Sequence, residues 1–142
     1  MKRGCPPRHG LSKTKIHNTW CNMHRRCYDK TVDSFGLYGG RGIGVCKRWH
    51  IFENFFEDMG DVPVGMSLDR INSDLDYLYS NCKWSTPKQQ ARNRRTNRSL
   101  KLNGRTMLVC EWAEELDISP FIISTRLHRG WPVVEALMGR NK

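Results

Sequence analysis

The sequence has no long apolar run and no apolar segment behind its basic N-terminus. No stretch approaches about eighteen apolar residues, so we expect no membrane-spanning helix. Met1, Lys2, Arg3 and Gly4 are not followed by the apolar region of a secretory signal, so we expect a cytoplasmic protein that is not secreted.

The sequence also lacks paired cysteines at zinc-binding spacing. Its six cysteines stand at positions 5, 21, 27, 46, 82 and 110, and no two are separated by two residues. Without a secretory signal, a disulfide framework is not expected. We therefore favour free or buried thiols, and a structural Zn²⁺ site built from scattered residues such as Cys27, Cys46 and Cys82 is the less favoured alternative.

What the chain does have is positive charge. It carries 24 Lys and Arg against 14 Asp and Glu in 142 residues, a formal net charge of +10. Only 38% of the residues are hydrophobic, which favours small modules joined by exposed segments over one large core. A basic balance favours a polyanionic partner, either nucleic acid or an anionic membrane surface. With no membrane segment expected, nucleic acid is the leading partner.

Two amphipathic helices are expected in the first half of the chain. Apolar positions recur at helical spacing over residues 13–29, and an aromatic stripe follows over 49–59, ended by Gly60. Between them, residues 39–44 contain four glycines, which indicates a tight turn or a close approach to another backbone. Arg41 lies within this stretch and is a candidate DNA contact.

Residues 67–96 predict a strand, an open loop, a second strand and a helix. Thr86 is a suitable N-cap for that helix, with Pro87 at its first position and Gln89 completing a capping box. Seven basic residues and no acidic one lie between positions 88 and 105. The expected phosphate contacts here are Lys88, Arg92, Arg94, Arg95, Arg98 and Arg105.

The same segment holds the side chains needed for metal-assisted phosphodiester hydrolysis. Such a reaction needs a cation, an activated water and stabilisation of the leaving oxygen. Asp69 is the first candidate ligand, and the amide oxygen of Gln90 or of Asn93 is the second. Oxygen ligands favour Mg²⁺ or Mn²⁺. Asn81 is expected to hydrogen-bond the backbone and hold the loop open.

The tail changes character after a basic linker expected at 97–105. Residues 106–142 predict two short helices, the second capped by Ser119 with Pro120 at its first position and stopped by Gly130. This pattern is typical of a helix-turn-helix, whose second helix reads the major groove, although a helical hairpin that only packs has the same pattern. Candidate reading residues are Phe121, Ser124, Thr125, Arg126, His128 and Arg129.

Taken together, these residues resemble the HNH, or His-Me finger (ββα-metal), nucleases. Asp69 matches the ligand of that family's first pair, Asn81 its central Asn, and Gln90 its helix ligand, while Arg70 stands at the general-base His. A group of phage and mobile-element members carries the same Asp-Arg pair. The tail, with Trp112-Ala113 and Arg129-Gly130-Trp131, resembles the DNA-binding tail of homing endonucleases.

The resemblance implies an α+β fold with a small ββα-metal core, flanking helices and a C-terminal helix-turn-helix-like module. The implied domains are 1–96, with the ββα segment at 67–96, and 106–142. It also implies one divalent ion per site, double-stranded DNA as substrate, and a bacterial or phage-infected cytoplasm. A monomer and a homodimer are both compatible with it.

Arg70 separates two functional hypotheses. An arginine stays protonated in proteins, so it can clamp a phosphate but cannot abstract a proton. Water activation would then come from Tyr77, from a histidine outside the segment (His9, His24 or His50), or from the metal alone. The first hypothesis is a metal-dependent endonuclease that nicks or cuts both strands. The alternative is a non-catalytic, sequence-specific DNA-binding protein on a degenerate nuclease fold.

Overall fold

The computed structural model describes residues 10–140 and divides the chain into two compact units, Met1–Asn93 and Arg94–Lys142. Within the described residues, each unit contains one two-stranded antiparallel sheet and its own hydrophobic core. The expectation of a mixed α+β fold is confirmed. His9, one of the candidate bases, lies outside the described residues.

The first unit is built around two helices, α1 (Lys15–Tyr28) and α2 (Phe52–Met59). Thr14 caps α1 by accepting a hydrogen bond from the His17 amide. The four apolar positions at helical spacing are the buried ones, which confirms the predicted face: Ile16, Trp20, Met23 and Cys27. They pack with Trp49, Phe52 and Phe55 in one core.

The glycine-rich stretch allows this core to close. One short 3-10 helix precedes it at Asp33–Leu37, the stretch itself begins with a second at Gly39–Arg41, and a third follows at Lys47–His50. Gly39 packs so tightly on α1 that a Cβ would lie 2.0 Å from the Cys27 carbonyl oxygen. Gly42 adopts φ +84°, a left-handed conformation that glycine tolerates. The predicted turn is therefore confirmed: Gly39 permits close packing, and Gly42 permits the left-handed backbone conformation.

A β-hairpin and a short helix complete the first unit. β1 (Ser67–Arg70) pairs with β2 (Cys82–Ser85), with Asp69 opposite Lys83. The next element, α3 (Pro87–Arg92), begins at the predicted capping box of Thr86 and Gln89. Asn93 is its C-cap, so the helix ends before Arg94 and Arg95, short of residue 96 where the predicted segment ends.

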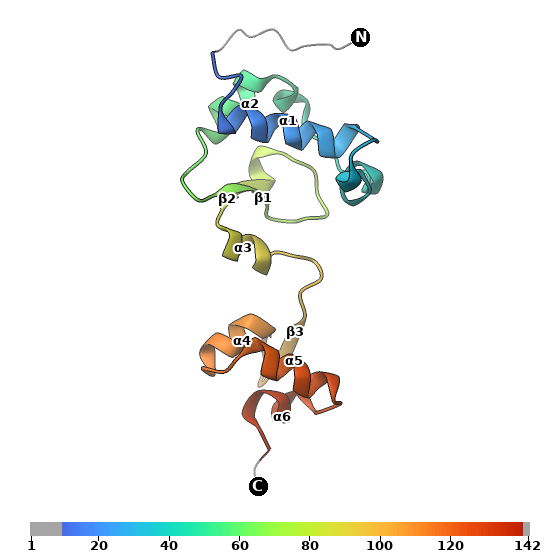
Figure 1. The fold of residues 1–142 in the computed structure, drawn as a ribbon, viewed down its shortest axis with the longest axis vertical. Helices are drawn as coiled ribbons and strands as arrows, with labels where there is room; N and C mark the ends of the chain where they lie inside the picture. The colour runs from blue at the N-terminus through green and yellow to red at the C-terminus, as the bar shows by residue number, and fades with distance from the viewer. Residues whose placement is uncertain (1–9, 141–142) are drawn as a thin grey trace. The chain divides into compact units, whose positions relative to one another are not determined.

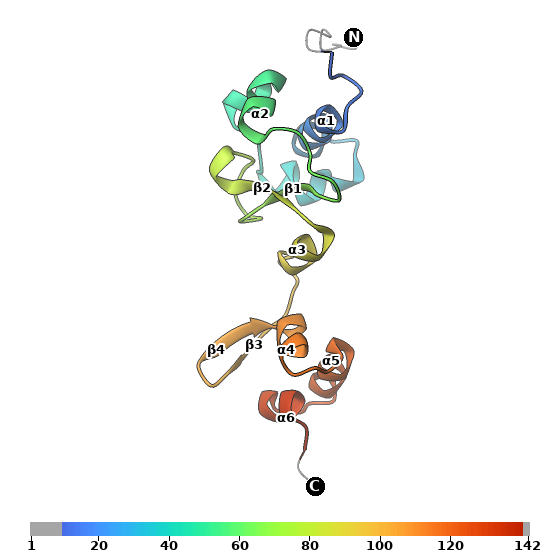
Figure 2. The same cartoon turned by 90° about the vertical axis from the view of Figure 1, so that its left-hand side faces the viewer.

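Alternation along β1 decides which side chains meet which helix. Successive side chains of a strand point to opposite faces. The Arg70 side chain is buried on the face of β1 that points to the core. Ser67 and Asp69 share the opposite face. In both views α3 lies on the side of the hairpin away from α1 and α2 (Figures 1 and 2). Asp69 is thereby placed near the end of α3.

The second unit begins with a hairpin that the sequence analysis missed. Instead of a linker, residues 97–105 contain β3 (Ser99–Leu102) and the start of β4 (Arg105–Leu108). Asn103 and Gly104 join the strands with φ +51° and +75°. Asn-Gly with two positive φ values is the preferred two-residue hairpin turn. The hairpin is drawn in Figure 2.

Three helices pack on this hairpin. They are α4 (Val109–Glu115), α5 (Pro120–His128) and α6 (Val133–Met138). Ser119 caps α5 and Pro120 stands at its start, as predicted. The core of the unit includes Leu100, Trp112, Ala113, Ile123 and Leu137. No helix among the described residues is long and apolar enough to cross a membrane.

Candidate metal and nucleic-acid site

Two polar side chains from different elements meet beside the first hairpin. Asp69 lies on β1, and Asn93 lies at the C-terminal end of α3. The Asn93 Nδ2 is 3.4 Å from each carboxylate oxygen of Asp69, and it also donates to the Arg70 carbonyl oxygen. Both side chains are half-buried, so the pair is positioned by the fold yet open to solvent.

The donor chemistry of this pair fits a hard divalent cation. A carboxylate and an amide oxygen are ligands that Mg²⁺ and Mn²⁺ accept, with water completing the coordination. The Asn93 Nδ2 faces both the Asp69 carboxylate and the Arg70 carbonyl oxygen. The Asn93 Oδ1 would reach a cation at Asp69 only if the amide turned and gave up its hydrogen bond to the Arg70 carbonyl. The residues that would hold the ion are therefore Asp69 and Asn93.

Gln90, the other candidate ligand, is engaged elsewhere. Its Nε2 donates to the Ser67 hydroxyl and, at 3.3 Å, to the Ser67 carbonyl oxygen. These bonds tie α3 to the first residue of β1. The structure therefore brings Asn93, and not Gln90, to Asp69. One helical turn separates the two amides, so residue spacing alone left both open.

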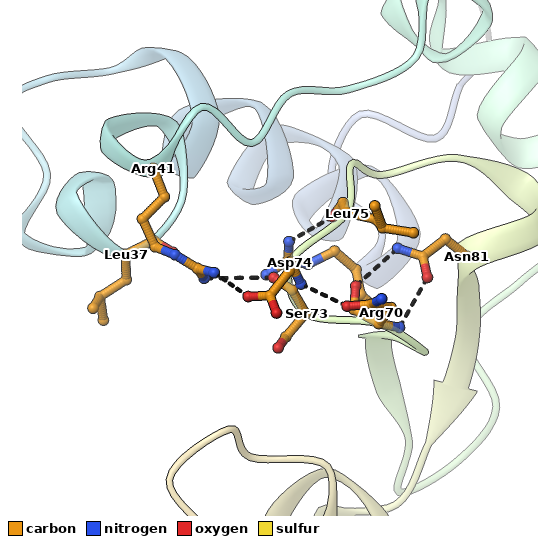
Figure 3. Close-up of polar contacts among 8 residues, drawn as sticks. Leu37, Arg41, Arg70, Ser73, Asp74, Leu75 and Asn81 are labelled. Atoms are coloured by element: carbon orange, nitrogen blue, oxygen red, sulfur yellow. Dashed lines mark hydrogen bonds and ion pairs between the residues drawn. The ribbon is translucent and has the colours of Figure 1, made fainter.

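Arg70 has a structural environment and not a catalytic one. It is 8% exposed, and its guanidinium carbon lies 5.0 and 4.9 Å from the ring centres of Tyr38 and Tyr77. Its Nη1 donates to the Leu75 carbonyl oxygen at 2.8 Å, which fastens the loop after β1 (Figure 3). The expectation that this side chain clamps a phosphate is not what the structure shows, because its charge is directed into the core.

Asn81 holds the loop between the strands, as predicted. Its Oδ1 accepts from the Asn72 amide at 2.9 Å, and its Nδ2 donates to the carbonyls of Asn72 and Asp76, both at 3.0 Å. It is 5% exposed, so these bonds lie away from water. Asn81 therefore acts as a scaffold for the loop that follows β1 (Figure 3).

Arg41 contacts the same loop, between β1 and β2, through Ser73 and Asp74. Its guanidinium forms an ion pair with Asp74 and donates to the carbonyls of Leu37 and Ser73, both at 3.4 Å (Figure 3). These contacts link the glycine-rich stretch to the loop. A DNA phosphate would have to compete with Asp74 for this arginine, so its predicted DNA contact is secondary to bracing the loop.

The candidate bases have packing environments. Tyr77 is 4% exposed, and burial raises the pKa of its phenol well above the usual value, so it stays protonated at neutral pH. His24 lies 3.1 Å from the Trp49 carbonyl oxygen, and burial lowers the pKa of its ring. His50 lies 3.2 Å from the Val45 carbonyl oxygen. Among the described residues, none of the three hydrogen-bonds Asp69.

Lys83 is a residue that the sequence reasoning missed. It is directly opposite Asp69 in the β1–β2 register, and opposite residues of an antiparallel pair project from the same face. Lys83 is exposed, and within residues 10–140 it forms no ion pair with a carboxylate. The period-two pattern of a hairpin could have identified it, had the register been known.

The predicted DNA-contacting residues fall into two groups. Lys88 and Arg92 lie on α3 in the first unit. In the second unit, Arg94, Arg95, Arg98 and Arg129 are exposed, and Thr125 is half-buried on α5. Two arginines are already engaged. Arg105 pairs with Glu115 at 2.7 Å, and Arg126 donates to the Ala136 carbonyl oxygen at 3.0 Å while stacking on Trp131.

The cysteines show no zinc-binding arrangement in the described part of the chain. No group of three or more His, Cys, Asp or Glu side chains is gathered there that could hold a metal ion. Burial raises the pKa of Cys27 to about 11 and that of Cys82 to about 12, so both thiols stay protonated.

No family model, no curated protein and no solved structure matches this chain.

Proposed function

We propose that the chain is a metal-dependent DNA endonuclease whose β1–β2–α3 segment is an HNH-type ββα-metal core. The observation that carries the proposal is the meeting of the Asp69 carboxylate and the Asn93 amide, which come from a strand and from the end of the following helix. The net charge of +10 supports a polyanionic substrate. Exposed arginines in the second unit support additional contacts to double-stranded DNA.

Each side chain has a distinct role in this proposal. Asp69 and Asn93 hold Mg²⁺ or Mn²⁺, which when bound polarises the scissile phosphate and lowers the pKa of water. Lys83, on the same face, stabilises the negative charge that develops on the phosphate. Asn81 and Arg70 position the loop and the strand. Arg70 takes no proton, so in this proposal the metal alone would activate the water.

The test measures the cutting of plasmid DNA by site variants in Mg²⁺ or Mn²⁺, with and without EDTA. Asp69→Ala and Asn93→Ala are expected to lower cutting by at least about a hundredfold, since a transition-state contact is removed. Gln90→Ala is the matched control for metal binding, because its amide hydrogen-bonds only Ser67 among the described residues, and it should bind Mn²⁺ as tightly as the wild type does. Direct Mn²⁺ titration should show weaker binding for Asn93→Ala than for Gln90→Ala.

A second candidate is a DNA-binding protein that does not cut. The burial of Arg70 favours it, because the position that carries a base in the resembling nucleases contributes nothing to the exposed face around Asp69. In that case the protein would bind duplex DNA with and without EDTA, and prolonged incubation with Mg²⁺ or Mn²⁺ would yield no relaxed or linear plasmid. This result would overturn the endonuclease proposal.

A further inference from the structure

A polar recess of about 200 Å³ lies in the first unit between α1, β1 and α3. Its polar lining includes Asn22 and Arg26 from α1, Ser67 from β1 and Gln90 from α3. No acidic side chain is among the described residues that line it. The recess therefore offers hydrogen-bond donors and positive charge, which suits an anion.

Arg26 provides the charge of this recess. Its guanidinium carbon lies 5.3 Å from the ring centre of Tyr38, and it donates to the Tyr77 hydroxyl. Within the described residues, no carboxylate pairs with it at ion-pair distance. A guanidinium has five N–H donors in a planar fork that fits phosphate. Stacking on Tyr38 fixes the orientation of that fork, and donors remain for a ligand.

Neutral donors lie beside Arg26. The Ser67 hydroxyl accepts a hydrogen bond from Gln90, so its own hydrogen can point into the recess. The exposed Asn22 adds an amide on the next turn of the helix from Arg26. Ser67 precedes Asp69 by two residues on the same face of β1, so the recess adjoins the candidate metal site.

We propose that this recess binds a backbone phosphate of duplex DNA that flanks the phosphate held at Asp69 and Asn93. Arg26 supplies the charge, and Asn22 and Ser67 supply neutral hydrogen bonds. Gln90 orients Ser67, which gives this amide a role without a metal. The proposal rests on the proposed function in that the ligand is DNA, but it concerns binding and not chemistry.

Affinity of the full chain for a labelled duplex, measured in EDTA over a series of KCl concentrations, tests the recess. Neutralising one phosphate releases counterions, so Arg26→Ala should reduce the slope of log affinity against log salt by about one. Asn22→Asp should weaken binding about tenfold at low salt, since a carboxylate would face the phosphate. Asn18→Asp makes the same charge change one turn earlier on α1, outside the lining, and should have a much smaller effect.

Combining Arg26→Ala with Asn22→Asp gives a further check. If both residues act on one phosphate, the second change should have little effect once the first is present. A thermal melt monitored by circular dichroism will show whether Arg26→Ala folds. If it does not fold, Asn22→Asp still tests the recess, because Asn22 is exposed. Equal losses for Asn18→Asp and Asn22→Asp, or wild-type affinity and slope in folded Arg26→Ala, would overturn the recess. A protein that shows the expected pattern but cuts no DNA supports the recess and overturns the endonuclease.

Discussion

Arg70 stands next to the candidate ligand Asp69 in the sequence, yet its side chain leaves from the opposite face of the strand. Its guanidinium stacks against Tyr38 and Tyr77 and donates to the Leu75 carbonyl oxygen. A buried arginine needs such partners because an uncompensated charge away from water is strongly destabilising. The same three contacts also join the glycine-rich stretch, the loop and β1, so this residue acts as a structural tie.

Replacing Arg70 therefore tests stability first. Arg70→Ala removes two cation–π contacts and a charged hydrogen bond, and we expect it to lower the free energy of unfolding of the first unit by about 3 kcal/mol. Arg70→His should also destabilise, because the shorter side chain cannot make all three contacts. Urea unfolding measures the change. Arg41→Ala, which removes an exposed arginine of the glycine-rich stretch that contacts the same loop, should change stability much less. A stable Arg70→Ala that has lost only catalysis would contradict the structural role.

The β1–β2 hairpin is joined by a loop in which one side chain, that of Asn81, hydrogen-bonds the backbone three times. Asn81→Asp keeps an acceptor for the Asn72 amide but replaces the donor to two carbonyls with a charged oxygen. We expect a loss of about 2 to 4 kcal/mol in stability and faster amide exchange across the loop. The control is Asn72→Ala. It removes an exposed side chain whose Oδ1 accepts a hydrogen bond from the Asp74 amide. If hydrogen exchange reports equal effects for both variants, Asn81 is not the central support.

Features that depend on residues close in the sequence, such as helix faces and caps, could be predicted. Contacts that depend on how two separate elements pack could not. The face of α1 and the Thr86 capping box follow from spacing and from contacts within four residues. The only local signal for the β3–β4 hairpin is Asn103-Gly104, and the basic residues around this turn equally favour an exposed linker. The choice of Asn93 over Gln90 required the distance between a strand and a helix end, which no local pattern encodes.

The whole molecule consists of two units with separate cores, so a defect in one need not unfold the other. Trp112 is 4% exposed, and its indole nitrogen donates to the Leu100 carbonyl oxygen, which joins α4 to the hairpin. Truncating a buried Trp removes about 3 to 5 kcal/mol, comparable to the whole stability of a unit this small. We therefore expect Trp112→Ala to unfold the second unit and leave the first intact.

The consequences for DNA follow from where the basic residues lie. An unfolded second unit keeps its arginines but loses their arrangement on α5 and the hairpin, so Trp112→Ala should reduce affinity for duplex DNA and site preference more than non-specific cutting in Mg²⁺. Two-dimensional NMR would show which unit has lost its dispersed signals, and mapping the cut positions would measure site preference. Phe121→Ala, which truncates an exposed aromatic of α5 without touching the core, separates a surface contact from unfolding. Equal loss of non-specific cutting and site preference in Trp112→Ala would mean that catalysis at Asp69 needs the second unit folded.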